Sequence, residues 1–283
     1  AGREVAHALV KQADIVVVGF KPGDEYKLEL DYETLSKINQ KLIYGQITAY
    51  GIDDPRPGFD AILQAESGFT FLNGEAHGPP VKMPVALIDL LLAHQLKEGL
   101  LVALLKRVQK GTGSLVTTSL FEAGVASLAN QATNYLIGGV TPQRLGSEHP
   151  NIVPYGSILT CKDGREFVIA AATERQYRSF VRALDLPDLA EDPQFATGQL
   201  RVERREDLLR VIRRRTKQLE SEALTSKLNK AKVPYGFVND MAEVFEQPGA
   251  KRLLLTGKSD NHPITGVRTL VFDGNAADFA NPS

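Results

Sequence analysis

Two short runs of β-branched residues follow segments of helical periodicity near the start of the chain. Residues 5–11 have helical spacing and lead into the apolar run 13–18, while the amphipathic segment 32–40, with Asp31 as N-cap, leads into 42–48. Apolar runs of this length are typical of buried parallel strands. The alternation of helix and strand therefore predicts an α/β sheet.

Three further helices are predicted before residue 140. The turn at 56–58 precedes a helical segment at 59–68, and 90–107 has the strongest helical pattern in the chain. Asp89 gives the start signal of the latter helix, and cations followed by glycine mark its end. Residues 117–135, rich in small and polar side chains, are also interpreted as a helix.

The character of the chain changes at residue 156. A strand pair is expected around the turn at 163–164, with 166–172 as its second strand, followed by a charged helix at 201–220 and an apolar-flanked turn at 233–236. We interpret 156–248 as a small α+β domain.

The remaining parts are assigned to a large domain. Residues 1–150 form its body, and 249–283, which contains strand-like apolar runs, is expected to return to it. The chain begins without Met inside a helical pattern, so we expect that a longer protein has lost its first part.

Composition excludes several classes of function. The 283 residues are 43% hydrophobic, and 33 Lys and Arg against 34 Asp and Glu give a net charge of -1, so no global field attracts nucleic acid or an anionic membrane. Apolar runs fall short of the roughly 20 residues of a membrane span. The single cysteine, Cys161, suits a reducing cytoplasm, and no His/Cys cluster with metal spacing is present.

Asp89 is the strongest candidate for chemistry. A carboxylate at the start of a long helix faces free backbone N–H groups and the positive end of the helix dipole, which favour its ionised form. An ionised carboxylate that is shielded from water can attack a thioester and form a mixed anhydride, and the same N–H groups can stabilise the oxyanion. The simpler interpretation of Asp89, by itself, is an N-cap.

A series of motifs in fixed order resembles the class III coenzyme A transferases of the CaiB/BaiF type. The segments that carry the resemblance are 13–23 (ADIVVVGFKPG), 30–35 (LDYETL), 42–44 (LIY), 56–68 (RPGFDAILQAESG), 78–89 (GPPVKMPVALID), 110–114 (KGTGS), 119–123 (SLFEA), 146–155 (GSEHPNIVPY) and 233–239 (VPYGFVN). They cover nearly the whole chain. One departure is Ile88, because family members usually have glycine just before the catalytic aspartate.

The resemblance implies a fold, a partner and a reaction. It implies an interlocked homodimer whose subunits have a Rossmann-like large domain and a small α+β domain. It also implies that Asp89 moves CoA between an acyl-CoA and a carboxylic acid through aspartyl anhydride and aspartyl-CoA intermediates. CoA is then a substrate, and no metal is expected.

The resemblance also implies where CoA is held. The expected contacts are Gly19, Phe20, Lys21, Lys27, Arg56, Pro57, Gly58 and Phe59. Such residues suit the ligand, because glycine admits a close backbone approach, an aromatic ring covers adenine and cations meet phosphates. The alternative for Lys21 and Lys27 is that they are solvated surface residues.

Two other functions stay open. Acyl-CoA racemases of the same superfamily exchange a proton with a histidine in a position that corresponds to Phe59, and phenylalanine carries no proton to exchange. A CoA-binding scaffold without turnover is the second alternative, because the family's first unit, with an early CoA-contacting arginine, has no counterpart before Ala1. The donor and acceptor acids do not follow from the sequence.

Overall fold

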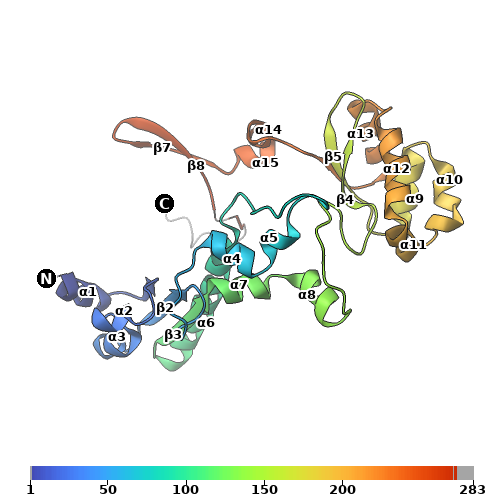
Figure 1. Cartoon of the computed structure of the whole chain (residues 1–283). Helices are drawn as coiled ribbons and strands as arrows, with labels where there is room; N and C mark the ends of the chain where they lie inside the picture. Colours follow the sequence, from blue (N-terminus) through green and yellow to red (C-terminus); the bar gives the residue numbers. More distant parts are fainter. Residues whose placement is uncertain (1, 270, 273–283) are drawn as a thin grey trace. The chain divides into compact units, whose positions relative to one another are not determined.

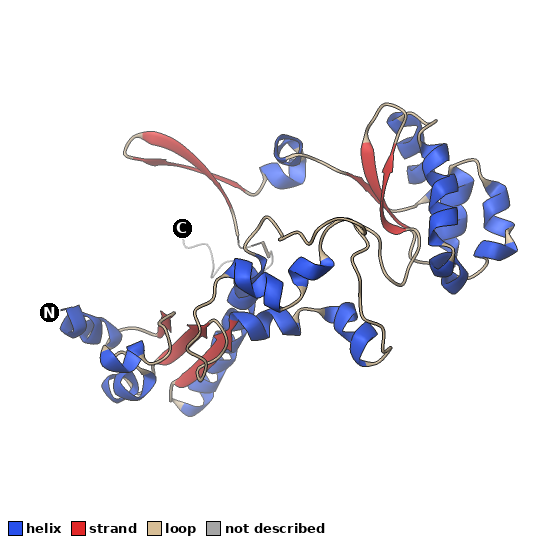
Figure 2. Cartoon of the chain, viewed as in Figure 1, coloured by secondary structure: helices blue, strands red, loops and turns tan. Residues whose placement is uncertain are grey.

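The structure is a computed structural model, and it describes residues 2–269 and 271–272. Contacts between Cα atoms divide the chain into two compact units, Ala1–Pro150 and Asn151–Ser283. Each unit is a mixture of helices and strands (Figures 1 and 2). The assignment of residues 1–150 to a large domain and of 156–248 to a small domain remains a prediction.

The first unit is built around a parallel sheet of three strands in the order β1-β2-β3. Its elements are α1 (Gly2–Val10), β1 (Ile15–Val18), α2 (Asp24–Lys27), α3 (Tyr32–Ile38), β2 (Ile43–Thr48), α4 (Asp60–Glu66), α5 (Phe69–Leu72), α6 (Leu87–Lys110), β3 (Ser114–Ser119), α7 (Leu120–Ala126) and α8 (Ala129–Leu136). The predicted strands 13–18 and 42–48 are confirmed as β1 and β2. Asp31 is confirmed as the N-cap of α3, because its side chain accepts a hydrogen bond from the backbone N–H of Thr34.

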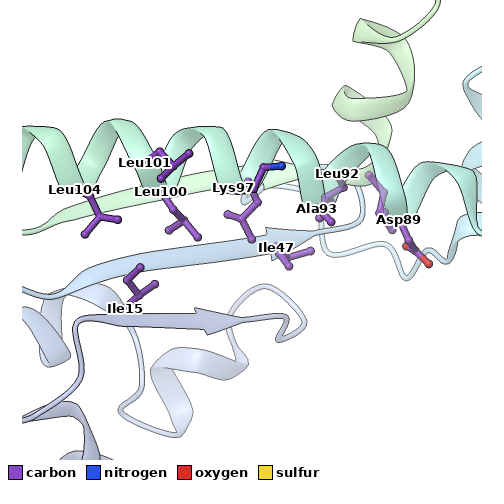
Figure 3. Close-up of a pocket in the computed structure, with 11 residues that line it drawn as sticks. Ile15, Ile47, Asp89, Leu92, Ala93, Lys97, Leu100, Leu101 and Leu104 are labelled. Carbon is purple, nitrogen blue, oxygen red and sulfur yellow. The ribbon is translucent and has the colours of Figure 1, made fainter. Parts of the chain in front are cut away.

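Glycines allow α6 to lie directly on the sheet. A Cβ atom at Gly99 would come within 2.6 Å of Val116 Cγ1 on β3, and one at Gly45 on β2 would come within 3.3 Å of Leu96 Cδ1. Helix α6 has 24 residues and is therefore about 36 Å long. It spans the sheet and carries its first turn beyond the end of β2, as Figure 3 shows.

The prediction of one helix over 117–135 is wrong. Residues Ser114–Ser119 form β3, which pairs with β2 and places Thr117 opposite Gln46. The Ser119 side chain then accepts from the N–H of Glu122 and starts α7. A positive φ of 49° at Ala129 separates α7 from α8. Sheet pairing therefore prevailed over the helical composition of this segment.

The second unit contains a three-stranded antiparallel sheet, β4-β5-β6, and a separate hairpin, β7-β8. Its elements are β4 (Tyr155–Thr160), β5 (Glu166–Ala170), α9 (Glu174–Ala183), α10 (Pro187–Glu191), η1 (Pro193–Phe195), α11 (Gly198–Glu203), α12 (Arg205–Thr216), α13 (Ser221–Ala231), β6 (Tyr235–Phe237), α14 (Met241–Glu246), α15 (Pro248–Lys251), β7 (Leu254–Ser259) and β8 (His262–Val267). The predicted strand pair around 163–164 is confirmed.

Two details of this unit differ from the prediction. The charged helix expected at 201–220 is interrupted at Arg204, whose φ of -107° and ψ of 29° are not helical, and its second part ends at Thr216. The expected turn at 233–236 instead enters β6, where Tyr235 lies opposite Ile169. The return of 249–283 to the large domain remains a prediction, and residues 270 and 273–283 lie outside the described part of the chain.

Candidate active site

Asp89 lies in the first turn of α6, but it is not the helix N-cap. The helix begins at Leu87, with Ala86 at the N-cap position and no side-chain cap. The expected start at Asp89 is therefore wrong by two residues. A different carboxylate performs the capping, because Asp60 Oδ1 accepts a hydrogen bond of 2.8 Å from the N–H of Ile88.

Most of the backbone N–H groups in this first turn are already engaged. Leu87 donates to the carbonyl of Val85, and Leu90 donates to that of Ala86. Among the described residues, only the N–H of Asp89 itself lacks a partner in this turn. The helix start therefore offers one backbone donor for an oxyanion rather than the several expected from the sequence.

Asp89 stands at one end of an apolar groove of about 500 Å³ (Figure 3). One face of α6 and the two strands β1 and β2 form the walls. The lining side chains are Ile15, Ile47, Asp89, Leu92, Ala93, Leu96, Lys97, Leu100, Leu101, Leu104 and Leu120. The groove thus places one carboxylate beside a surface of aliphatic carbon.

The surroundings raise the pKa of Asp89 above its ordinary value. Partial burial against apolar side chains is the main cause, and the negative charge of Asp60 is the second. The sequence led us to expect the opposite, an ionised form stabilised by the helix dipole. Asp89 is also exposed in the single chain, so the expected exclusion of water is not met by this chain alone.

The expected CoA contacts follow two neighbouring strands. Gly19, Phe20 and Lys21 come directly after β1, and 56–59 lies between β2 and α4. Because β1 and β2 are parallel, both segments leave the same edge of the sheet. The Gln46 side chain on β2 donates to Glu25, which ties the sheet to α2 and hence to Lys27.

The expected CoA contacts differ in how far their side chains are exposed to a ligand. Phe59 is 77% exposed, whereas Phe20 packs against the apolar cluster around Val18, Leu35 and Tyr44. A Cβ atom at Gly58 would come within 2.7 Å of Leu63 Cδ2, so the backbone there needs glycine. Pro57 is exposed beside it.

Two of the three expected cations, Lys27 on α2 and Arg56 before α4, already have acidic partners. Lys27 Nζ lies 2.7 Å from Asp24 Oδ1. Arg56 pairs with Asp54 at 2.8 Å and lies 3.8 Å over the ring of Tyr50. These pairs are exposed and cost little to exchange for a phosphate.

The structure does not bring the expected CoA contacts into the groove that contains Asp89. None of the eight expected CoA contacts lines the groove that contains Asp89. Asp60, directly after Phe59, makes the connection through Ile88. Asp60 and Gln64 were not predicted from the sequence as functional residues, although both lie in the motif at 56–68 and are four residues apart on a helix, a spacing that allows their side chains to meet.

The described part of the chain contains neither a metal-binding cluster nor a membrane-spanning helix. Within 2–269 and 271–272, no group of three or more His, Cys, Asp or Glu side chains is placed to hold a metal ion. In the same part of the chain, no helix has both the length and the apolar character needed to cross a membrane.

Comparisons with known proteins agree on one family. The model of CoA-transferase family III matches residues 1–278. The succinate–glutarate CoA-transferase of Agrobacterium fabrum is 34% identical over 100% of this chain and 72% of its own length. The human succinyl-CoA:glutarate CoA-transferase is 34% identical over 87% of this chain, and a Fusarium pseudograminearum acyl-CoA transferase is 34% identical over 96%.

Solved structures agree with this result. A CaiB/BaiF family protein from Brucella suis has a TM-score of 0.79 and 36% identity, covering 97% of this chain and 72% of the other. A Mycobacterium tuberculosis protein has a TM-score of 0.84 at 25% identity, covering 96% of this chain and 74% of the other. The chain spans 57% of the length of the human and Fusarium relatives. This chain belongs to CoA-transferase family III.

Proposed function

We propose that this protein moves CoA from an acyl-CoA to a carboxylic acid, with Asp89 as the covalent nucleophile. The observation that carries the proposal is the position of Asp89, on the first turn of α6 and at one end of an apolar groove. The family membership supports the reaction type.

The chemistry needs no redox step and no metal. Asp89 attacks the thioester carbonyl, the carbon–sulfur bond breaks, and CoA leaves as its thiolate while the acyl group stays on Asp89 as a mixed anhydride. The thiolate then attacks the aspartyl carbonyl, which releases the first acid as a carboxylate and leaves an aspartyl-CoA thioester. The acceptor carboxylate repeats these two steps in reverse order, which yields the new acyl-CoA and restores Asp89.

The environment of Asp89 suits a nucleophile. Burial against apolar groups and the charge of Asp60 destabilise the ionised form, which is why its pKa is raised. A carboxylate that its surroundings stabilise less is a stronger nucleophile. Binding of a thioester over the groove would remove more water from Asp89 and strengthen this effect.

We place CoA along the loops that follow β1 and β2. In this arrangement Phe59 covers the adenine ring, Lys27 and Arg56 meet phosphates, and Gly19 allows the backbone to approach the ligand. Support comes from the exposed ring of Phe59 and from the open space around Gly19, where a Cβ atom would meet nothing within 4 Å.

We also propose that the protein acts as a homodimer in which the two units form a Rossmann-like domain and a small α+β domain. Support comes from an exposed apolar stripe on α6, which consists of Leu101, Val102, Leu105 and Val108, each 53% to 84% exposed. A second copy covering this stripe would also shield the neighbouring groove from water. Light scattering that gave a monomer mass would contradict the dimer.

Trapping of the intermediate tests the nucleophile. The relatives' names contain succinate and glutarate, so succinyl-CoA and glutarate are the first substrates to try. Incubation with succinyl-CoA followed by borohydride or hydroxylamine should modify Asp89, detected by peptide mass spectrometry. A racemase would instead exchange solvent deuterium into the substrate without an adduct, and an inert scaffold would bind CoA and do neither.

A further inference from the structure

We propose that Gln64 is a positioning residue that fixes the segment entering α6 and thereby sets where Asp89 meets the thioester. This inference rests on the function proposed above. Gln64 is fully buried at 0% exposure and lies on α4, one turn after Asp60. Gln64 is not among the residues that line the groove.

Three hydrogen bonds use the whole amide group of Gln64. Its Oε1 accepts from the backbone N–H of Met83 at 2.9 Å. Its Nε2 donates to the carbonyl oxygen of Val85 at 3.1 Å and to Oδ2 of Asp60 at 2.7 Å. Only one orientation of the amide satisfies all three partners, because Met83 offers a donor while Val85 and Asp60 offer acceptors.

Asp60 extends this arrangement into the first turn of α6. With Oδ2 held by Gln64, its Oδ1 accepts from the N–H of Ile88, and Asp60 itself is only 8% exposed. The two side chains therefore hold the chain at Met83, Val85 and Ile88. We call this set of four hydrogen bonds the Gln64 clamp.

The place of Asp89 depends on this clamp. The segment 79–86 has no helix or strand, and after the backbone hydrogen bond from Val81 to Asn73 the contacts of Gln64 at Met83 and Val85 guide it into α6. Asp89 follows Ile88 directly and shares its turn of helix. A loosened clamp lets the first turn of α6 shift or fray, and a misplacement of about 1 Å at a reacting group can cost about 100-fold in rate.

A purely structural role is the alternative, and it predicts a different result. Loss of buried hydrogen bonds would then lower stability without changing the turnover of the folded molecules. A matched control exists in the same unit. The Asn39 amide also makes three hydrogen bonds, all to backbone groups: Nδ2 donates to the carbonyls of Val10 and Ala13, and Oδ1 accepts from the N–H of Lys41. Asn39 precedes β2 and therefore lies at the opposite end of the strands from Asp89.

The experiment compares Gln64→Met with Asn39→Leu in the full chain, using succinyl-CoA and glutarate. Each substitution keeps an apolar stem and removes an amide. We expect kcat of Gln64→Met to fall about 10- to 100-fold, with KM for succinyl-CoA changed by less than about 3-fold. Asn39→Leu should keep the wild-type kcat. If Gln64→Met does not give folded protein, Gln64→Asn replaces it, because that variant keeps a neutral amide in the buried site but is one methylene too short to reach all three partners.

Amide hydrogen exchange supplies the readout of the clamp itself. The N–H groups of Met83 and Ile88 should exchange slowly in the wild type and faster in the Gln64 variant, with the central turns of α6 unchanged. Wild-type kcat in a folded Gln64 variant would overturn the positioning role alone. Absence of transfer and of Asp89 labelling in the wild type would overturn the proposed function, and the positioning role with it.

Discussion

The Asp60 carboxylate accepts a 2.8 Å hydrogen bond from the backbone N–H of Ile88, immediately before Asp89. This contact joins two segments that are 28 residues apart in the chain. It stabilises the positive end of α6 with one carboxylate while leaving the other, Asp89, free at the groove. The two acids therefore have different surroundings, and the pKa of Asp89 is raised mainly by its partial burial and further by the charge of Asp60.

Replacement of Asp89 by Asn should abolish transfer. The amide is nearly the same size but is too weak a nucleophile to form the anhydride, so we expect kcat to fall by about 1000-fold or more. Turnover and borohydride labelling measure the effect, and Asp188→Asn, in the second unit, serves as the control. Full exchange activity in Asp89→Asn would show that another group is the nucleophile.

Removal of the charge at Asp60 should move the pH dependence of kcat. The proposed nucleophile, Asp89, has to be ionised to attack, so activity should fall as pH drops through its pKa. Because burial and the charge of Asp60 both raise that pKa, Asp60→Asn should lower it and shift the acidic limb to lower pH. Besides Asp89, Lys97 is the charged residue that lines the groove, and the Asp60→Asn substitution does not change it.

The raised pKa of Asp89 also makes the stability of the folded chain depend on pH. A carboxyl whose pKa is raised on folding binds its proton more tightly in the folded chain, so its stabilising contribution is present at low pH and is lost as pH rises through the folded pKa. In the kinetic experiment, a pH profile of kcat for Asp60→Asn that overlays the wild-type profile would show that the charge of Asp60 does not raise the pKa of Asp89.

Phe59→Ala should weaken CoA binding without affecting the fold. The ring is 77% exposed, so its removal leaves the core intact. Loss of stacking on adenine is worth about 1 kcal/mol, which corresponds to a rise in KM for the acyl-CoA of about 5-fold. Steady-state kinetics and thermal melting measure the two effects. Tyr135→Ala, with a ring 57% exposed on α8, is the control, and an equal rise in its KM would count against a specific contact at Phe59.

Gly113→Ala should destabilise the first unit. A Cβ atom there would lie 1.9 Å from the carbonyl oxygen of Leu42, and the backbone of β2 cannot move away without breaking sheet pairing. We expect a loss of about 3 kcal/mol in the free energy of unfolding. Gly236→Ala, where a Cβ atom meets nothing within 4 Å, should change stability little. Calorimetry compares them, and equal melting temperatures would contradict the predicted clash.

Much of the secondary structure is determined by the sequence itself. β2 is buried along nearly its whole length, whereas β1 leaves Val17 half exposed, yet both runs have the apolar, β-branched composition that indicates parallel strands. The Asp31 cap is an interaction between residues three apart, which local sequence contains. The motifs also predicted the family and drew attention to Asp89.

The tertiary structure decided the rest. Residues 114–119 became β3 because β2 was there to pair with, and a pairing partner about 70 residues away leaves no local signal. The Gln64 clamp likewise joins α4 to a segment about 20 residues further on. The pKa of Asp89 depends on which apolar side chains and which carboxylate lie beside it in space, and the local pattern that predicted its helix contains neither.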